Sequence, residues 1–173
     1  MTRFFKIGWR TGKIALDSIF QGEAVETYLP IIPPIAALVL FALWAMTLVL
    51  AVGAWRVSLV MAGRAHAGTF TPGAPHGSDT YWRLNRAHLN AVENLPIFGA
   101  LVLGGSVLQV PDLSFQILPS LVLYARLAQS LIHIASGSAL AVTLRFTAYA
   151  VQVVAMIVLA GVVARAAGLP MPW

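Results

Sequence analysis

The chain has 173 residues, 59% hydrophobic and only 10% charged, with a mean hydropathy of +0.82; soluble domains carry about 25% charged residues, so a soluble globular protein is excluded. The net charge of +5 is scattered among apolar runs, which excludes a nucleic-acid-binding face and leaves anionic lipid or a small anionic ligand. There is no cysteine, so any thiol chemistry must use a thiol brought by a cosubstrate.

Residues 1–29 form a leader ahead of the first apolar run. On a helical wheel its apolar and charged side chains separate, which predicts an amphipathic helix lying in the membrane interface. The alternative is a disordered basic leader, because Gly8 and Gly12 weaken the helix. The apolar face comprises Phe5, Trp9, Leu16, Ile19 and Phe20, and the charged face comprises Arg3, Lys6, Arg10, Lys13 and Asp17.

Four helices are expected in one membrane domain over residues 30–168, followed by a tail at 169–173. The first span covers 31–55 and opens with two prolines, which are tolerated in a first turn. After a loop at 64–80, Ser78 or Asp79 caps the second helix, which continues past Pro96 with a kink. Short turns then separate a third span at 118–134 and a fourth at 139–163. Tyr81, Trp82 and Trp55 are interpreted as anchors at the membrane interface.

Three of these helices carry polar side chains at helical spacing, so each set falls on one face. An ionised side chain inside the bilayer costs about 2.5–3.5 kcal/mol, so these groups require partners, water or a ligand. A single stripe is equally consistent with a hydrogen-bonded seam between helices. Three together, with several arginines and one acid, favour a bound anion. The stripes are Arg83, Arg86, Asn90, Glu93 and Asn94; Arg126, Gln129, Ser130 and His133; and Arg145, Tyr149 and Gln152.

The histidines and acids do not predict a metal site. His88 and Glu93 lie on different faces of the second helix, and His66 and His76 lie in the loop, so no helical ligand pair forms. The positive charges are nearly balanced between the two sides of the membrane. Weighting them by distance from the first span predicts that the loop between the first and second helices is cytoplasmic.

The segment Arg83-Leu-Asn-Arg86-Ala-His-Leu-Asn90-Ala-Val-Glu93-Asn-Leu-Pro-Ile-Phe98 resembles the second-helix signature of the MAPEG family, the membrane-associated proteins in eicosanoid and glutathione metabolism. Weaker resemblances follow the other helices, so the likeness covers about residues 30–168. They are Gly53-Ala-Trp-Arg56, Tyr124-Ala-Arg126, and Arg145 with Tyr149.

This resemblance implies an all-α, four-helix integral membrane bundle that forms a homotrimer and binds glutathione between neighbouring subunits near the cytoplasmic side. We expect a bacterial-type member in the inner membrane. The matching positions imply a glutathione site made of Arg56, Arg83, Arg86, Asn90, Glu93, Arg126, Gln129 and Tyr149, with Arg145 near the sulfur.

The hypothesis for the chemistry is that Arg145 stabilises the glutathione thiolate, helped by a hydrogen bond from Tyr149 or His133. The thiolate then attacks a lipophilic electrophile or hydroperoxide from the bilayer. The sequence departs from the family pattern where Trp82 replaces an acid and where Gln129 and His133 replace a His and a Tyr.

Two other functions remain open from sequence alone. The first is a non-catalytic lipid-binding or scaffold protein of the same fold, because the family includes a non-enzymatic, lipid-presenting member. The second is a proton or ion pathway lined by Glu93, Arg126 and His133, which four short spans without an inverted repeat disfavour.

Overall fold

The computed structural model describes residues 30–70 and 77–170. Over these ranges the regular structure is helical: α1 spans Pro34–Met61, α2 Asp79–Val107, α3 Leu113–Ala135 and α4 Ala139–Ala166, with a 3₁₀ turn at Ala67–Thr69. The amphipathic helix predicted within residues 1–29, and residues 171–173 of the tail, lie outside the described residues.

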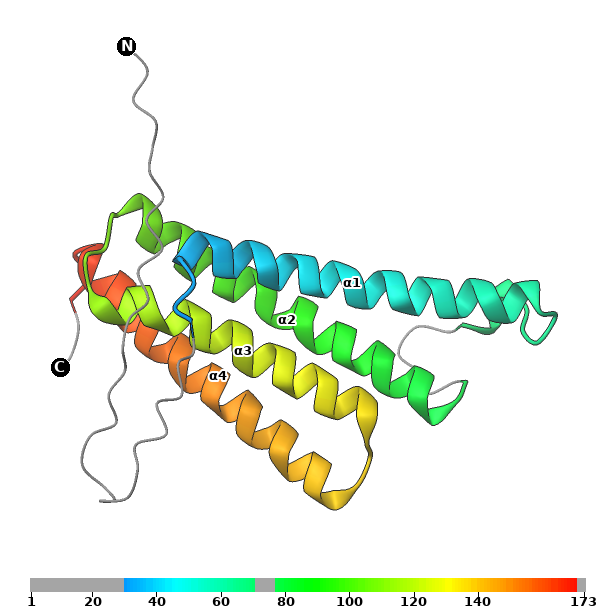
Figure 1. Cartoon of the computed structure of the whole chain (residues 1–173). Helices are drawn as coiled ribbons and strands as arrows, with labels where there is room; N and C mark the ends of the chain where they lie inside the picture. Colours follow the sequence, from blue (N-terminus) through cyan, green and yellow to red (C-terminus); the bar gives the residue numbers. More distant parts are fainter. Residues whose placement is uncertain (1–29, 71–76, 171–173) are drawn as a thin grey trace, which may run out of the picture.

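The four helices pack side by side as one bundle, and successive helices run in opposite directions (Figure 1). α1 and α4 lie on opposite sides of the bundle, and each packs against both α2 and α3. The most extensive packing is between α3 and α4, which a three-residue turn joins. This topology brings the end of α3 and the start of α4 beside the first half of α2.

Within the part of the chain that the structure describes, three helices are long and apolar enough to cross a bilayer: α1 and α4 with 28 residues each and α3 with 23. Their outward faces are apolar, as at Leu50 and Ile157, which are 65% and 64% exposed in the single chain. α2 is equally long at 29 residues, but Asp79, Arg83, Arg86 and Glu93 interrupt its apolar character.

Capping side chains mark where three of the helices begin. Ser78 Oγ accepts a hydrogen bond from the backbone N–H of Tyr81, which confirms Ser78 rather than Asp79 as the cap of α2. Asp112 Oδ1 accepts from the backbone N–H of Ser114 at 2.7 Å and starts α3 five residues before the predicted 118, at Leu113. Ser138 caps α4 in the same way.

The interpretation of Tyr81 as a membrane-interface anchor is wrong. Tyr81 is fully buried, and its ring lies 6.2 Å from the Trp55 ring and 6.3 Å from the Phe70 ring. Its hydroxyl accepts a hydrogen bond from Arg56 Nε at 2.7 Å. α1 does not end at the predicted Trp55 but continues to Met61.

The core between the helices is apolar at the end of the bundle farther from the α3–α4 turn. Phe41 of α1 and Phe98 of α2 are fully buried, with ring centroids 5.2 Å apart. Farther along, Gly105 of α2 lies directly against the Phe115 ring of α3. Between α3 and α4, nearer the α3–α4 turn, buried polar side chains accompany the apolar core and adjoin the site; they are Arg126, Gln129, Ser130 and Gln152.

Candidate functional site

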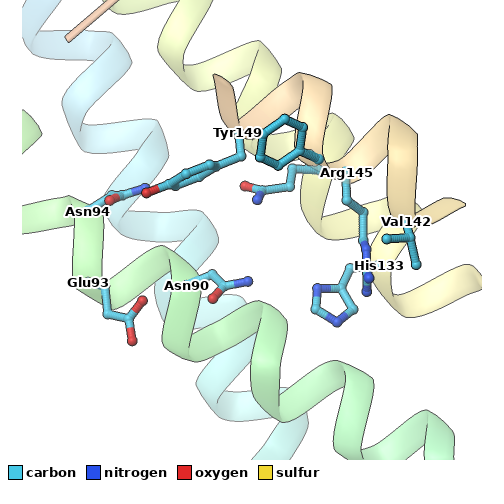
Figure 2. Close-up of a pocket in the computed structure, with 9 residues that line it drawn as sticks. Asn90, Glu93, Asn94, His133, Val142, Arg145 and Tyr149 are labelled. Carbon is cyan, nitrogen blue, oxygen red and sulfur yellow. The ribbon is translucent and has the colours of Figure 1, made fainter. Parts of the chain in front are cut away.

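A cavity of about 380 Å³ lies where α2, α3 and α4 meet, near the α3–α4 turn (Figure 2). Its volume falls within the range of about 300–1,000 Å³ that small-molecule sites occupy. All three predicted polar stripes contribute to it. The lining residues are Asn90, Glu93, Asn94, Gln129, His133, Val142, Arg145, Phe146 and Tyr149.

The α2 wall of the cavity consists of Asn90, Glu93 and Asn94. Spacings of three and four residues place these side chains on one face of the helix, the face that the sequence predicted. Glu93 is the acid among the described residues that line the cavity, and it is exposed in the single chain. This wall therefore offers one negative charge and two amides.

The α4 wall combines charge with apolar surface. Arg145 and Tyr149 are one turn apart, and Val142 and Phe146 precede and follow Arg145 on the same side of the helix. Tyr149 extends from α4 toward α2, where Asn94 lies, whereas Arg145 extends toward His133 (Figure 2). Val142 and Phe146 were not predicted, because apolar residues in an apolar helix give no distinguishing signal.

Positive charge gathers around His133. Arg83, Arg86 and Arg145 all lie within electrostatic range of its imidazole. Arg83 is held in place, since its Nε donates to the carbonyl of Ile134 at 3.2 Å and its Nη2 donates to Thr80 Oγ1 at 3.0 Å. Arg86 is exposed in the single chain. Arg83 and Arg86 lie beside the cavity but are not among the residues that line it, whereas Arg145 is.

A buried hydrogen-bonded network adjoins the cavity and consists of Arg126, Gln129 and Gln152. Arg126 is fully buried, and its Nη1 donates to Gln129 Oε1 at 2.7 Å. Gln152, also fully buried, donates from Nε2 to the same oxygen at 3.0 Å. The guanidinium carbon of Arg126 lies 5.6 Å from the centre of the Phe41 ring, a cation–π distance. Arg126, which the resemblance placed on glutathione, therefore reaches the cavity through Gln129.

Arg56 lies outside the cavity of its own chain. Besides its hydrogen bond to Tyr81, its guanidinium lies 5.4 Å from the centre of the Phe70 ring and 5.9 Å from that of Tyr81. Phe70 lies in the loop between α1 and α2, so its contacts with Arg56 and Tyr81 hold this part of the loop against the start of α2. The structure thus separates Arg56 from the other predicted ligand contacts.

The arrangement suits an organic ligand with charges of both signs. Guanidiniums bind carboxylates and other anions through directed hydrogen bonds, and the Glu93 carboxylate can accept from an ammonium group. The side chains of Val142 and Phe146 provide an apolar surface against which an apolar group of the ligand can pack. Within residues 30–70 and 77–170 there is no group of three histidines, aspartates or glutamates that could hold a metal ion.

The described residues define a helical, multi-pass membrane protein with a polar cavity near one end of its bundle, lined by Arg145 and bordered by Arg83 and Arg86. A model of the MAPEG family matches residues 34–165, from the start of α1 to the end of α4. The chain belongs to the MAPEG family. A search of curated proteins finds no match to it.

Proposed function

We propose that the protein is a glutathione-dependent membrane transferase or peroxidase that activates the glutathione thiolate for attack on lipophilic electrophiles or hydroperoxides. The observation that carries the proposal is the cavity between α2, α3 and α4, which Glu93 of α2 and Arg145 of α4 both line. Glutathione has two carboxylates, one ammonium and a thiol, so it needs cations, one acid and a group that stabilises sulfur.

Arg145 is the residue to which we assign thiolate stabilisation. It lines the cavity, and no carboxylate of the described residues forms an ion pair with it, so its charge is available to a ligand. A cation near a thiol lowers the thiol pKa and raises the fraction of nucleophilic thiolate. Tyr149 and His133 line the same cavity and supply further donors. The ends of the tripeptide are bound by Asn90, Glu93, Arg83 and Arg86.

The lipophilic second substrate reaches the sulfur from the bilayer in this proposal. Phe146 and Tyr149 are 69% and 43% exposed in the single chain, and they border the cavity on the helix that faces lipid. The thiolate carries out the displacement on an electrophile or the two-electron reduction of a hydroperoxide. The chain contributes electrostatic stabilisation of the sulfur, which is the largest catalytic effect available without a protein nucleophile.

We further propose that the protein is a homotrimer with α2 as its fourth membrane-spanning helix. Arg86 and Glu93 are exposed on a helix that otherwise lies among apolar neighbours, and charged groups at that depth require a polar cover. A neighbouring subunit provides that cover and closes the cavity. Arg56 then contacts glutathione from a neighbouring subunit, because it lies away from the cavity of its own chain.

The thiolate absorbs in the ultraviolet, so difference absorbance on mixing glutathione with purified protein near neutral pH tests the proposal directly. We expect a saturable signal that Arg145→Ala abolishes. Arg165→Ala is the matched control, because Arg165 lies on the same helix but is 71% exposed at its far end, 3.4 Å from Asp112. A signal that survives Arg145→Ala contradicts the assignment to Arg145, and no signal from the wild type contradicts glutathione as the thiol.

A second candidate function is binding of a lipid without catalysis. A mainly apolar groove of about 320 Å³ between α1 and α3 favours it; among its lining residues are Leu40, Leu43, Leu123 and Leu127. If the protein binds no glutathione yet retains a defined lipid through purification, this candidate replaces the enzyme. Mass spectrometry of the purified protein distinguishes the two.

We propose a membrane orientation in which the loop after α1 is in the bacterial cytoplasm and the cavity lies near the cytoplasmic side of the inner membrane. The absence of native cysteine makes this testable with single cysteines. Thr69→Cys lies in that loop and Leu169→Cys lies beyond the opposite end of the bundle; both positions are exposed. In intact inner-membrane spheroplasts, a membrane-impermeant maleimide should label the cysteine at 169 and not that at 69. The reverse pattern contradicts the orientation.

A further inference from the structure

Gln129 is the point at which the buried polar network meets the cavity. Its side chain lines the cavity, yet the residue is only 6% exposed. A primary amide has an acceptor end and a donor end, and these differ in which ligand groups they bind. The orientation of this amide therefore decides what the α3 wall offers to a ligand.

The chemistry of its neighbours fixes that orientation. Arg126 is a donor without acceptor capacity, so the Gln129 atom 2.7 Å from its Nη1 must be the oxygen. The Gln152 atom 3.0 Å from that oxygen must then be the nitrogen. The backbone carbonyl of Ala148 identifies the same Gln152 atom as the nitrogen, because a carbonyl can only accept and the atom lies 3.1 Å from it. The Arg126 donor at one end and the Ala148 carbonyl at the other therefore specify the same orientation of the Gln129 and Gln152 amides.

We infer that Gln129 donates an N–H to an acceptor on the ligand, and that Arg126 and Gln152 are positioning residues that hold it in this orientation. The Gln129 oxygen already accepts two hydrogen bonds, so the amide nitrogen is the end left for the cavity. Neither Arg126 nor Gln152 lines the cavity. The inference rests on the proposed function. It specifies an acceptor, namely a carboxylate, carbonyl or thiolate, at the α3 wall, and it excludes an ammonium there.

Gln129→Glu tests the donor at the cavity. The carboxylate has almost the shape of the amide, and one of its oxygens keeps the contact with Arg126, so we expect the variant to fold and its melting temperature not to fall. Its second oxygen replaces the N–H and repels an acceptor. Glutathione affinity, measured by calorimetry, should fall about tenfold or more, and further than in Gln129→Met, which lacks both the donor and the repulsion. Wild-type affinity in Gln129→Glu overturns the inference.

Gln152→Leu tests the positioning role. Gln152 Oε1 has no hydrogen-bond partner among the described residues, so replacing the side chain with leucine removes an unsatisfied polar atom along with the donor. We expect a loss of glutathione affinity of about three- to tenfold, because one of two bonds that orient Gln129 is gone. Thr147→Val is the matched control and should leave affinity unchanged, because Thr147 is exposed on the same helix and its hydroxyl donates only to the backbone carbonyl of Thr143.

Ligand analogues separate positioning from a general structural defect. Wild type and Gln152→Leu are compared with glutathione, with glutathione whose glycine carboxylate is an amide, and with S-methylglutathione. If Gln129 donates to one of these groups, the variant loses affinity for glutathione but little more for the analogue lacking that group. An equal loss for all three ligands, accompanied by a lower melting temperature of Gln152→Leu, shows a structural role for Gln152 and overturns the positioning inference. If wild type itself binds no glutathione, the proposed function fails instead, and the two failures are distinct.

Discussion

Replacing Gly105 with alanine is expected to destabilise the protein, although alanine is the better helix former. A Cβ at Gly105 would lie 2.1 Å from one ring carbon of Phe115 and within 2.8 Å of two more. Carbon atoms pack at about 3.5–4.0 Å, so the ring must move by about 1.5 Å. Phe115 is 3% exposed and has little room for this. Overpacking of this kind costs about 1–3 kcal/mol. The gain in helix propensity is at most about 1 kcal/mol, so a net loss of up to about 2 kcal/mol follows.

Gly104→Ala is the matched control, because it places the same methyl group one residue earlier. Its nearest contact is Val163 Cγ1 at 3.7 Å, an ordinary van der Waals distance. We expect Gly104→Ala to be neutral or to stabilise by up to about 1 kcal/mol. Unfolding in mixed micelles with increasing dodecyl sulfate, followed by far-ultraviolet circular dichroism, measures both variants. Phe115→Leu should relieve the clash in the Gly105→Ala background. If both alanines change stability in the same direction, the packing argument is wrong.

Three further predictions concern the ends of the bundle and the cavity. Ser114 holds the pKa of the Asp112 carboxyl below its usual value, through its hydroxyl first and its backbone N–H second. The ionised cap stabilises the fold fully above the unfolded-state pKa of about 4, and this stabilisation is lost as pH falls through the folded-state pKa. The melting temperature should therefore decline in acid, and Asp112→Asn should reduce that decline. Tyr81→Phe keeps the ring over Arg56 but removes the hydroxyl that accepts from its Nε, and should cost about 1–3 kcal/mol in the same micelle titration; no loss would show that Arg56 finds another acceptor. Tyr149→Phe should lower the glutathione thiolate signal by up to about tenfold, because a hydrogen bond to a charged group contributes about 1.5 kcal/mol or more; an unchanged signal assigns the donor to another residue.

Helical periodicity was enough to predict the elements and most of the cavity. Asn90, Glu93 and Asn94 were predicted to share a face, and that face lines the cavity. The same holds for His133 and for Arg145 with Tyr149. The reason is that a charged or amide side chain stands out in an apolar helix, and the positions of the stripes along the chain place them at the same depth in an antiparallel bundle.

Periodicity did not show which polar residues face a neighbour and which face the cavity. Arg126 and Gln129 share a stripe, yet Arg126 is fully buried against Phe41 of α1, whereas Gln129 lines the cavity. The difference depends on packing partners such as Phe41, which are distant in sequence. Tyr81 was misinterpreted for the same reason: an aromatic residue at the start of a helix is typical of an interface, but here Phe70 from the preceding loop packs against it.

The burial of Arg126 has a consequence for how the protein enters the membrane. Its guanidinium is completely buried, and no carboxylate of the described residues forms an ion pair with it. It lies against Phe41 of α1 and donates to Gln129. Gln152 of α4 donates to the same Gln129 oxygen. Alone in lipid, an arginine at mid-helix costs about 2.5–3.5 kcal/mol. α4 carries Gln152, which joins the Arg126 network through Gln129, and α4 follows α3 after a three-residue turn. α3 is therefore better suited to leaving the insertion machinery together with α4, as a hairpin, than to partitioning into lipid by itself.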